Sequence, residues 1–236
     1  MKLKIKTVFI SIGLILFLGC QALAQVKPNV LLLPLNDSMI VFQRSVQKIA
    51  AYNGISNDSL KKIVHKNSLN RLISNFGAFN VKTISDFGYP HFSSSIAGDY
   101  KQWNSFKINY TSDSNGNIVF NPENEPGSRH VYWGRIFTEE QKEVLNALIE
   151  KEKIDYIFCI TKFEASTPRP FNRNTHFSLH FEILNSQLNK IFGSKSYVQE
   201  HLSKRVYIDV VWYLINNSID EVYRKSLNFI KTRERK

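Results

Sequence analysis

The chain has 236 residues, of which 43% are hydrophobic and 13% aromatic, with only 10 glycines and 7 prolines. This composition excludes a disordered or collagen-like chain and predicts a folded protein with a packed core. The formal net charge is +11, so a partner attracted by the overall field of the protein would be acidic.

Residues 1–24 have the pattern of a secretory signal peptide. Three lysines within the first six residues precede an apolar run from Val8 to Gly19, which is too short to span a bilayer. Ala22-Leu23-Ala24 fits the small-x-small rule of signal peptidase, so cleavage is predicted between Ala24 and Gln25. Removing residues 1–24, which hold three Lys and no acid, lowers the net charge from +11 to +8.

A second processing site competes with the first. Phe17-Leu18-Gly19-Cys20 resembles the lipobox of bacterial lipoproteins, in which the cysteine is lipidated and becomes the new N-terminus. Both alternatives predict an exported protein that is periplasmic or associated with the outer membrane.

Two strands and two helices are predicted before residue 85. Val30–Leu35 is a short apolar run followed by a polar segment, as in a buried strand that enters a loop. Residues 42–52 predict a short helix. From Ser56 to Phe76 the apolar residues keep a helical spacing, and a glycine follows as the stop signal. Phe79–Ile84 alternates as a strand does.

Residues 85–137 are rich in glycine, proline and serine, which predicts a loop-rich insert. Within it, Phe106–Tyr110 and Ile118–Phe120 flank a polar Asn-Gly segment, which predicts a hairpin. The polar segment distantly resembles a calcium loop, but its glycine is in the fourth position instead of the sixth, and a plain turn is favoured. The residues concerned are Asp113, Asn115 and Asn117.

A helix followed by a central strand is predicted after the insert. Thr138 and Gln141 form a capping-box pair at the start of an amphipathic stretch that runs to about Lys153. Tyr156–Ile160 is a continuous apolar run, typical of a strand buried on both faces.

The remaining elements complete an α/β domain. Thr175–Ile183 alternates strictly between apolar and polar residues, and a turn leads from it into a second strand over residues 191–197. Residues 204–231 keep a roughly helical spacing of apolar residues. The fold class predicted for residues 25–236 is therefore a single α/β (α+β) domain. Its mixed sheet is flanked by helices, carries an inserted hairpin with long loops, and is closed by a C-terminal helix.

The polar side of the alternating strand holds His176, His180 and Glu182, residue types that bind transition metals. Residues four apart on a strand are about 13 Å apart, so His176 and His180 cannot share one ion. His180 and Glu182 are weak metal-ligand candidates that need a further ligand from another element. The alternation alone predicts a solvated polar face, which is the interpretation we favour. No catalytic residue, cofactor or metal is assigned.

Cys159 lies in the apolar run Ile157–Ile160, with no neighbouring base to lower the pKa of its thiol. A buried structural role is therefore predicted. Cys20 is either removed or lipidated, which excludes an intramolecular disulfide. His91 and His130 lie in the insert without an acid partner nearby in the sequence.

Two surface features suggest partners. Bases gather near the end of the chain and would attract anionic phospholipid, lipopolysaccharide or an acidic protein, whereas nucleic acid is not expected after export. They are Arg224, Lys225, Lys231, Arg233, Arg235 and Lys236. Aromatic residues in the insert predict either a contact surface or a small core beneath the loops. They are Tyr89, Phe92, Tyr100, Trp103, Tyr132 and Trp133.

The order of elements resembles a family of bacterial envelope proteins that includes CsgG, LpoB and the N-terminal domain of TolB. The resemblance covers about residues 29–84 and 138–231, with Asp155-Tyr156 at the start of the central strand, where the family has an Ala-Asp-Tyr-like segment. It implies docking and assembly, not catalysis. The predicted function is thus a non-enzymatic interaction or assembly component of the cell envelope. The alternative is a small periplasmic hydrolase or metal-dependent enzyme that uses His180 and Glu182 with His130.

Overall fold

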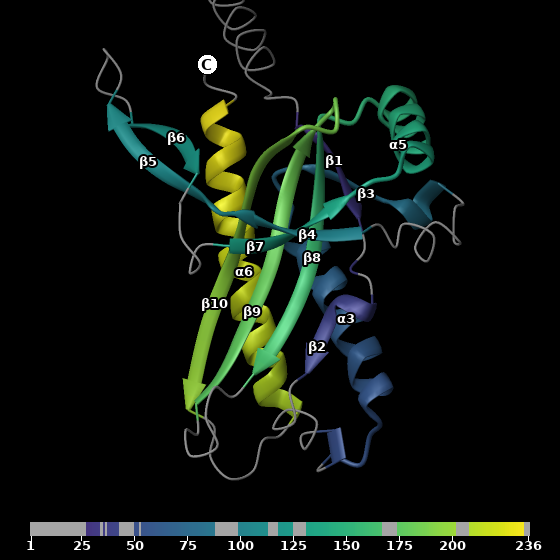
Figure 1. Ribbon diagram of the computed structural model, residues 1–236, viewed down its shortest axis with the longest axis vertical. Helices are drawn as coiled ribbons and strands as arrows, with labels where there is room; N and C mark the ends of the chain where they lie inside the picture. The colour runs from purple at the N-terminus through teal and green to yellow at the C-terminus, as the bar shows by residue number, and fades with distance from the viewer. Residues whose placement is uncertain are drawn as a thin grey trace, which may run out of the picture.

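The structure is a computed structural model that describes most of the chain beyond the export signal (Figure 1). The described residues are 27–33, 35, 37–42, 50–51, 53–87, 99–112, 118–124, 131–166, 174–201 and 208–233. Both predicted processing sites, at Cys20 and at Ala24-Gln25, lie outside them, as do His91, His130 and the turn that holds Asp113, Asn115 and Asn117.

The centre of the molecule is a six-stranded mixed sheet. Its order is β10-β9-β8-β1-β3, and β2 pairs with β8 beyond the end of β1. The strand β1 is parallel to β3 and β8, and β2 is parallel to β8, whereas β9 runs antiparallel to both β8 and β10. The bounds are β1 Asn29–Leu33, β2 Ile40–Phe42, β3 Asn80–Thr83, β8 Tyr156–Ser166, β9 Asn174–Asn185 and β10 Lys190–His201. The predicted α/β class with a mixed sheet is confirmed.

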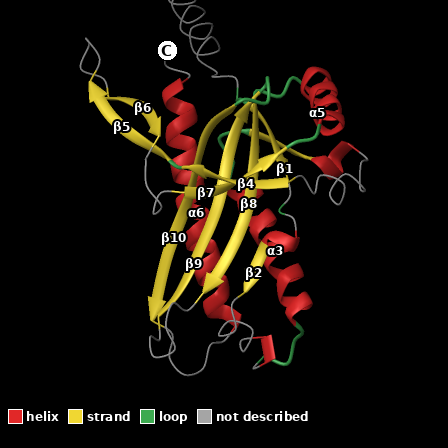
Figure 2. Ribbon diagram, in the orientation of Figure 1, coloured by secondary structure: helices red, strands yellow, loops and turns green. Residues whose placement is uncertain are grey.

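Long helices flank the sheet (Figure 2). They are α3 Asn57–Asn75, α5 Glu139–Glu152 and α6 Ile208–Arg233, with short 3-10 turns at Asp37–Met39 and Ile84–Phe87. The N-cap of α3 is Ser56, whose hydroxyl accepts from the Ser59 amide at 3.0 Å. The predicted capping box between Thr138 and Gln141 is present at the start of α5. Of the helix predicted at 42–52, Ala50 and Ala51 are helical, Phe42 instead belongs to strand β2, and residues 43–49 and 52 lie outside the described residues.

The two faces of the sheet are covered differently. One face packs against α3 and α6 in a core that includes Phe158, Phe177 and Phe181, each at most 1% exposed. The other face packs against α5 near the start of β8, where Ile157 and Cys159 are buried. The predicted burial of Ile157, Phe158 and Cys159 is confirmed.

The insert forms two antiparallel strand pairs. The predicted hairpin is confirmed as β5 with β6, and a further pair, β4 with β7, was not predicted. Their bounds are β4 Asp99–Asn104, β5 Phe106–Ser112, β6 Ile118–Asn124 and β7 Val131–Ile136. Only Ser105 separates β4 from β5, so the two pairs are consecutive parts of one ribbon. We refer to β4 and β7 as the crossing ribbon, because they run across the long strands (Figure 1).

Candidate functional site

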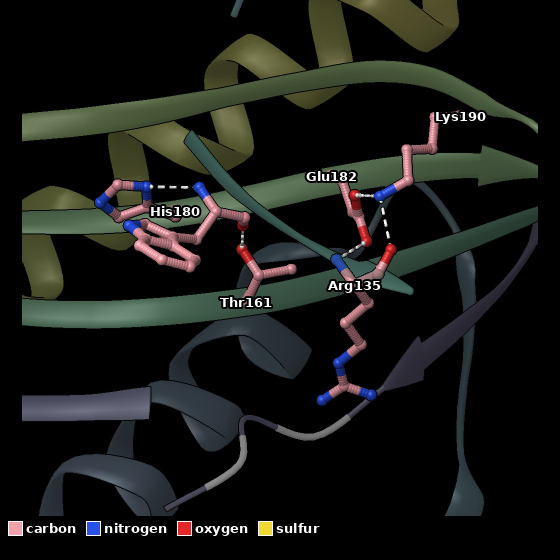
Figure 3. A network of polar contacts seen from close by, with 6 residues as sticks. Arg135, Thr161, His180, Glu182 and Lys190 are labelled. Atoms are coloured by element: carbon pink, nitrogen blue, oxygen red, sulfur yellow. Dashed lines mark hydrogen bonds and ion pairs between the residues drawn. The ribbon is translucent and has the colours of Figure 1, made fainter. Parts of the chain in front are cut away.

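The crossing ribbon lies on the sheet face opposite α3 and α6, where it contacts β8, β9 and β10. One edge of β7 pairs with β4. At its other edge, the backbone groups of Trp133 and Arg135 point away from β4, and polar side chains of the sheet meet them (Figure 3). A strand edge that is covered without such partners would bury unsatisfied N–H and C=O groups at a large cost.

Four side chains satisfy this edge. The Trp133 amide donates to His180 Nδ1 at 3.0 Å, and the Trp133 carbonyl accepts from the Thr161 hydroxyl. The Arg135 amide donates to Glu182 Oε1 at 2.8 Å. Lys190 Nζ donates to the Arg135 carbonyl at 2.6 Å and forms an ion pair with Glu182 Oε2 at 2.6 Å.

A bulge in β8 helps to place Thr161. The pairing of β8 with β9 shifts between Ile160 and Lys162, so Thr161 is the extra residue. Ile160 and Phe163 both belong to the core against α3 and α6, which leaves Thr161 and Lys162 for the face that carries the ribbon. A bulge redirects a side chain in this way.

The predicted solvated face is wrong at this point of β9. His180 is 5% exposed and Glu182 is fully buried, because β7 covers them. The alternation in the sequence is the same whether water or a strand edge lies over the polar side. The strand that covers it, β7, lies 47 residues earlier in the chain, so no local pattern indicates it. His176, further toward the start of β9, is half-buried and has no part in the network; its ring lies 5.1 Å from that of Tyr197.

His180 is held in its neutral form. Burial, reinforced by Lys162 and Lys195, lowers the pKa of His180 to about 3. Its Nδ1 accepts a hydrogen bond, which places the ring proton on Nε2, 3.5 Å from the Ser178 hydroxyl. The lone pair that would bind a metal or take a proton from a substrate is therefore already occupied.

Glu182 is also fully engaged. Burial raises the pKa of Glu182, and the neighbouring Lys190 ammonium opposes that shift. One carboxylate oxygen bonds the Arg135 amide and the other bonds Lys190, so the ion pair is part of the contact between ribbon and sheet. Cys159 offers no nucleophile here, since burial raises the pKa of its thiol to about 12.

Two glycines allow the close approach of ribbon and sheet. A Cβ on Gly134 would lie 2.5 Å from Glu182 Oε2 and 2.7 Å from Lys190 Nζ. A Cβ on Gly193 in β10 would overlap the ring of Tyr132, which is fully buried. Larger residues at either position would push the strands apart.

The aromatic residues of the ribbon divide between core and surface. Tyr132 is buried, as expected for a small core beneath the insert, whereas Trp103 on β4 is 38% exposed. Lys190 Nζ lies 4.5 Å from the Trp103 ring centroid, and Lys162 Nζ lies 5.3 Å from that of Trp133. Such cation–π contacts add to the docking of the ribbon. Tyr89 and Phe92 lie outside the described residues.

Sequence reasoning missed three residues of the site, and one of them had a local signal. Arg135 is 2% exposed and lies in the otherwise apolar run Val131–Phe137, where a single charge indicates a special environment. Its side chain points away from Glu182 and Lys190 (Figure 3). Thr161 and Lys190 carried no signal, since Thr161 follows the predicted strand 156–160 and Lys190 precedes the predicted strand 191–197.

Within the described part of the chain, no three His, Cys, Asp or Glu side chains lie close enough together to hold a metal ion. None of the described helices is both long and apolar enough to cross a bilayer.

No protein-family model and no curated protein matches this chain. Solved structures that match include two PelC dodecamers from Paraburkholderia phytofirmans. One, a point variant, has a TM-score of 0.34 and 7% identity, and the match covers 82% of this chain and 86% of that chain. The other has a TM-score of 0.32 and 8% identity over 84% of this chain and 88% of that chain. Likeness this remote supports no argument about function.

Proposed function

We propose that this chain is an exported component of the cell envelope that acts through binding and assembly and not through catalysis. The signal-peptide pattern of residues 1–24 supports the location, and the resemblance to the CsgG, LpoB and TolB type supports the mode of action. Protein partners of such a component would be other proteins of the envelope.

The proposal rests on the hydrogen bonds that His180 and Glu182 make in the structure. They are the residues that the sequence put forward for metal binding, and both serve as hydrogen-bond partners for the edge of β7. An enzyme of the alternative class would need these atoms free to meet a substrate or an ion. Here they join two layers of the fold, which is a structural role.

Site-specific photo-crosslinking in native envelopes tests the proposal. A photoreactive residue is placed in turn at Gln102 on β4, Glu140 on α5 and Lys62 on α3, three exposed positions on different elements. We expect a discrete protein adduct from positions on one surface and none from the others, because a specific partner covers only part of the molecule.

Elemental analysis of the purified protein can contradict the proposal. One equivalent of zinc in the purified protein that is lost in His180→Gln would replace the proposal with the metal-dependent enzyme. The absence of a protein adduct at all three positions would also contradict the proposal, provided that the photoreactive residue at each position still reacts with solvent.

A further inference from the structure

The long strands β8, β9 and β10 continue beyond the crossing ribbon, and on the ribbon side no other element of the described chain lies over them (Figure 1). Gly193 of β10 faces Tyr132 of the ribbon, so Lys195 and Tyr197, two and four residues further on, share that side of the sheet. We call this surface the open face; its residues are Lys162 and Glu164 of β8, Ser178 of β9, and Lys195 and Tyr197 of β10.

The edge of β7 fixes the direction of a short chain of hydrogen bonds that ends on the open face. The Trp133 amide donates to His180 Nδ1, so the ring proton is on Nε2, which lies 3.5 Å from the Ser178 hydroxyl. Ser178 therefore accepts from His180 and cannot donate its own proton to that nitrogen. Glu164, directly opposite Ser178 on β8, bonds Lys162 at 2.9 Å instead. Within the described part of the chain, the Ser178 proton has no acceptor.

Lys195 places a positive charge beside this hydroxyl. It is partly buried, lies opposite His180 in the strand register, and is close enough to lower the pKa of His180 together with Lys162. The charge of Lys162 is balanced by Glu164, whereas Lys195 has no ion pair with an acid among the described residues. The open face therefore has two lysines and one acid, and its net charge is +1.

These groups complement a carboxylate. A single excess positive charge and a hydroxyl that must donate fit one singly charged acceptor, whereas the second charge of a phosphate dianion would be repelled by Glu164. The ring of Tyr197 is 52% exposed and is held against the ring of His176, with 5.1 Å between centroids. A fixed, exposed tyrosine offers flat apolar contact of the kind found in protein interfaces.

We infer that the open face binds an acidic segment of a partner protein, with a carboxylate held by Lys195 and Ser178 and the segment lying against Tyr197. An unpaired lysine or an exposed tyrosine alone is ordinary on a protein surface. Here both lie beside a hydroxyl whose proton the ribbon contact leaves available. The inference rests on the proposed function and adds to it the docking surface and the chemistry of the partner.

Titration of the processed chain with hexaglutamate, a peptide with blocked ends, tests the inference by NMR. Hexaglutamine is the uncharged control, and about 0.15 M salt screens long-range attraction. We expect saturable shifts of the Ser178, Lys195 and Tyr197 amides with hexaglutamate and none with hexaglutamine. Lys195→Gln should weaken binding about 10-fold, whereas Lys195→Arg, which keeps the charge, should bind within about 3-fold of the wild type.

Two controls separate this site from general attraction. Lys62→Gln removes the same charge from an exposed position of α3, on the opposite side of the sheet, and should change binding less than about 2-fold. Thermal melts show whether each variant folds. An equal loss in Lys62→Gln and Lys195→Gln, or no shift at Ser178 and Lys195, would overturn the inference.

Inorganic phosphate at matched ionic strength tests the class of anion. It should shift the Ser178 and Lys195 amides less than hexaglutamate does, and tighter binding of phosphate would overturn the assignment to a carboxylate. Because hexaglutamate is supplied directly, its failure to bind excludes this surface whether or not crosslinked adducts form. The absence of envelope adducts contradicts the proposed function whether or not hexaglutamate binds.

Discussion

The two faces of the central sheet are covered by different kinds of element, and the residues that meet those elements differ accordingly. On one face, helices cover apolar residues such as Phe177 and Phe181. On the other face, α5 covers apolar residues near the start of β8, and the crossing ribbon covers the polar residues Thr161, His180 and Glu182. A helix satisfies its own backbone and needs apolar contacts, whereas the edge of a strand brings free N–H and C=O groups that need polar partners. What covers a face therefore decides which residues lie on it.

The largest expected effect is on the helix-covered face. Phe158 is 1% exposed and packs between Phe76 and Phe181, with ring centroids 5.1 and 5.9 Å away. Phe158→Ala should lower the free energy of unfolding by about 3–5 kcal/mol through lost transfer energy and a cavity. Chemical denaturation measures it, with Tyr197→Ala at an exposed site as the control. Equal midpoints for Phe158→Ala and wild type would contradict the packing.

Glu182→Ala tests the ribbon-covered face. It removes the partner of Lys190 and the acceptor of the Arg135 amide together, and the loss should be about 3 kcal/mol. The matched control is Glu164→Ala, whose ion pair with Lys162 at 2.9 Å lies on partly exposed side chains and should contribute less than about 1 kcal/mol. If both variants lose the same stability, the ribbon contact does not depend on Glu182.

The pH dependence of stability should distinguish His180. The unfolded chain binds a proton on this residue below its ordinary pKa of 6.5, and the folded protein does so only near 3. The contribution of His180 is complete above about pH 6.5 and is lost as pH falls through this window, with a slope of up to about 1.4 kcal/mol per pH unit. His180→Gln should flatten the profile between those values in urea titrations. An unchanged slope would show that His180 titrates alike in both states.

The smallest effect is expected at His176. It lies on the same strand and the same side as His180, but no backbone group of the ribbon bonds to it. His176→Gln should change the free energy of unfolding by less than about 1 kcal/mol, mainly through the lost contact with Tyr197. A loss as large as that of Glu182→Ala would mean that the covered region extends further along β9.

Most of the fold could be predicted because its signals are local. The cap at Thr138, the helical spacing of 56–76 and the apolar run at 156–160 each depend on residues within a few positions of one another. The predicted strand at 156–160 was too short, since β8 continues to Ser166 through a polar stretch whose pairing with β2 and β9 supplies the missing stability.

The site could be predicted only in part because it depends on contacts between residues far apart in the sequence. The alternation of β9 singled out His180 and Glu182, but their role follows from the edge of β7, which lies across them. The β4/β7 pair joins residues about thirty positions apart around the predicted hairpin. Its strands are short and mostly polar on β4, so no periodic pattern marked them.

Hydrogen exchange at single amides tests the central claim most directly, because the claim concerns individual N–H groups. If side chains of the sheet hold the edge of β7, the amides of Trp133 and Arg135 are protected in the native protein. In His180→Phe the Trp133 amide should lose protection while amides paired between β8 and β9 keep theirs. Rapid exchange of Trp133 and Arg135 in the wild type, or unchanged protection of Trp133 in His180→Phe, would contradict the account.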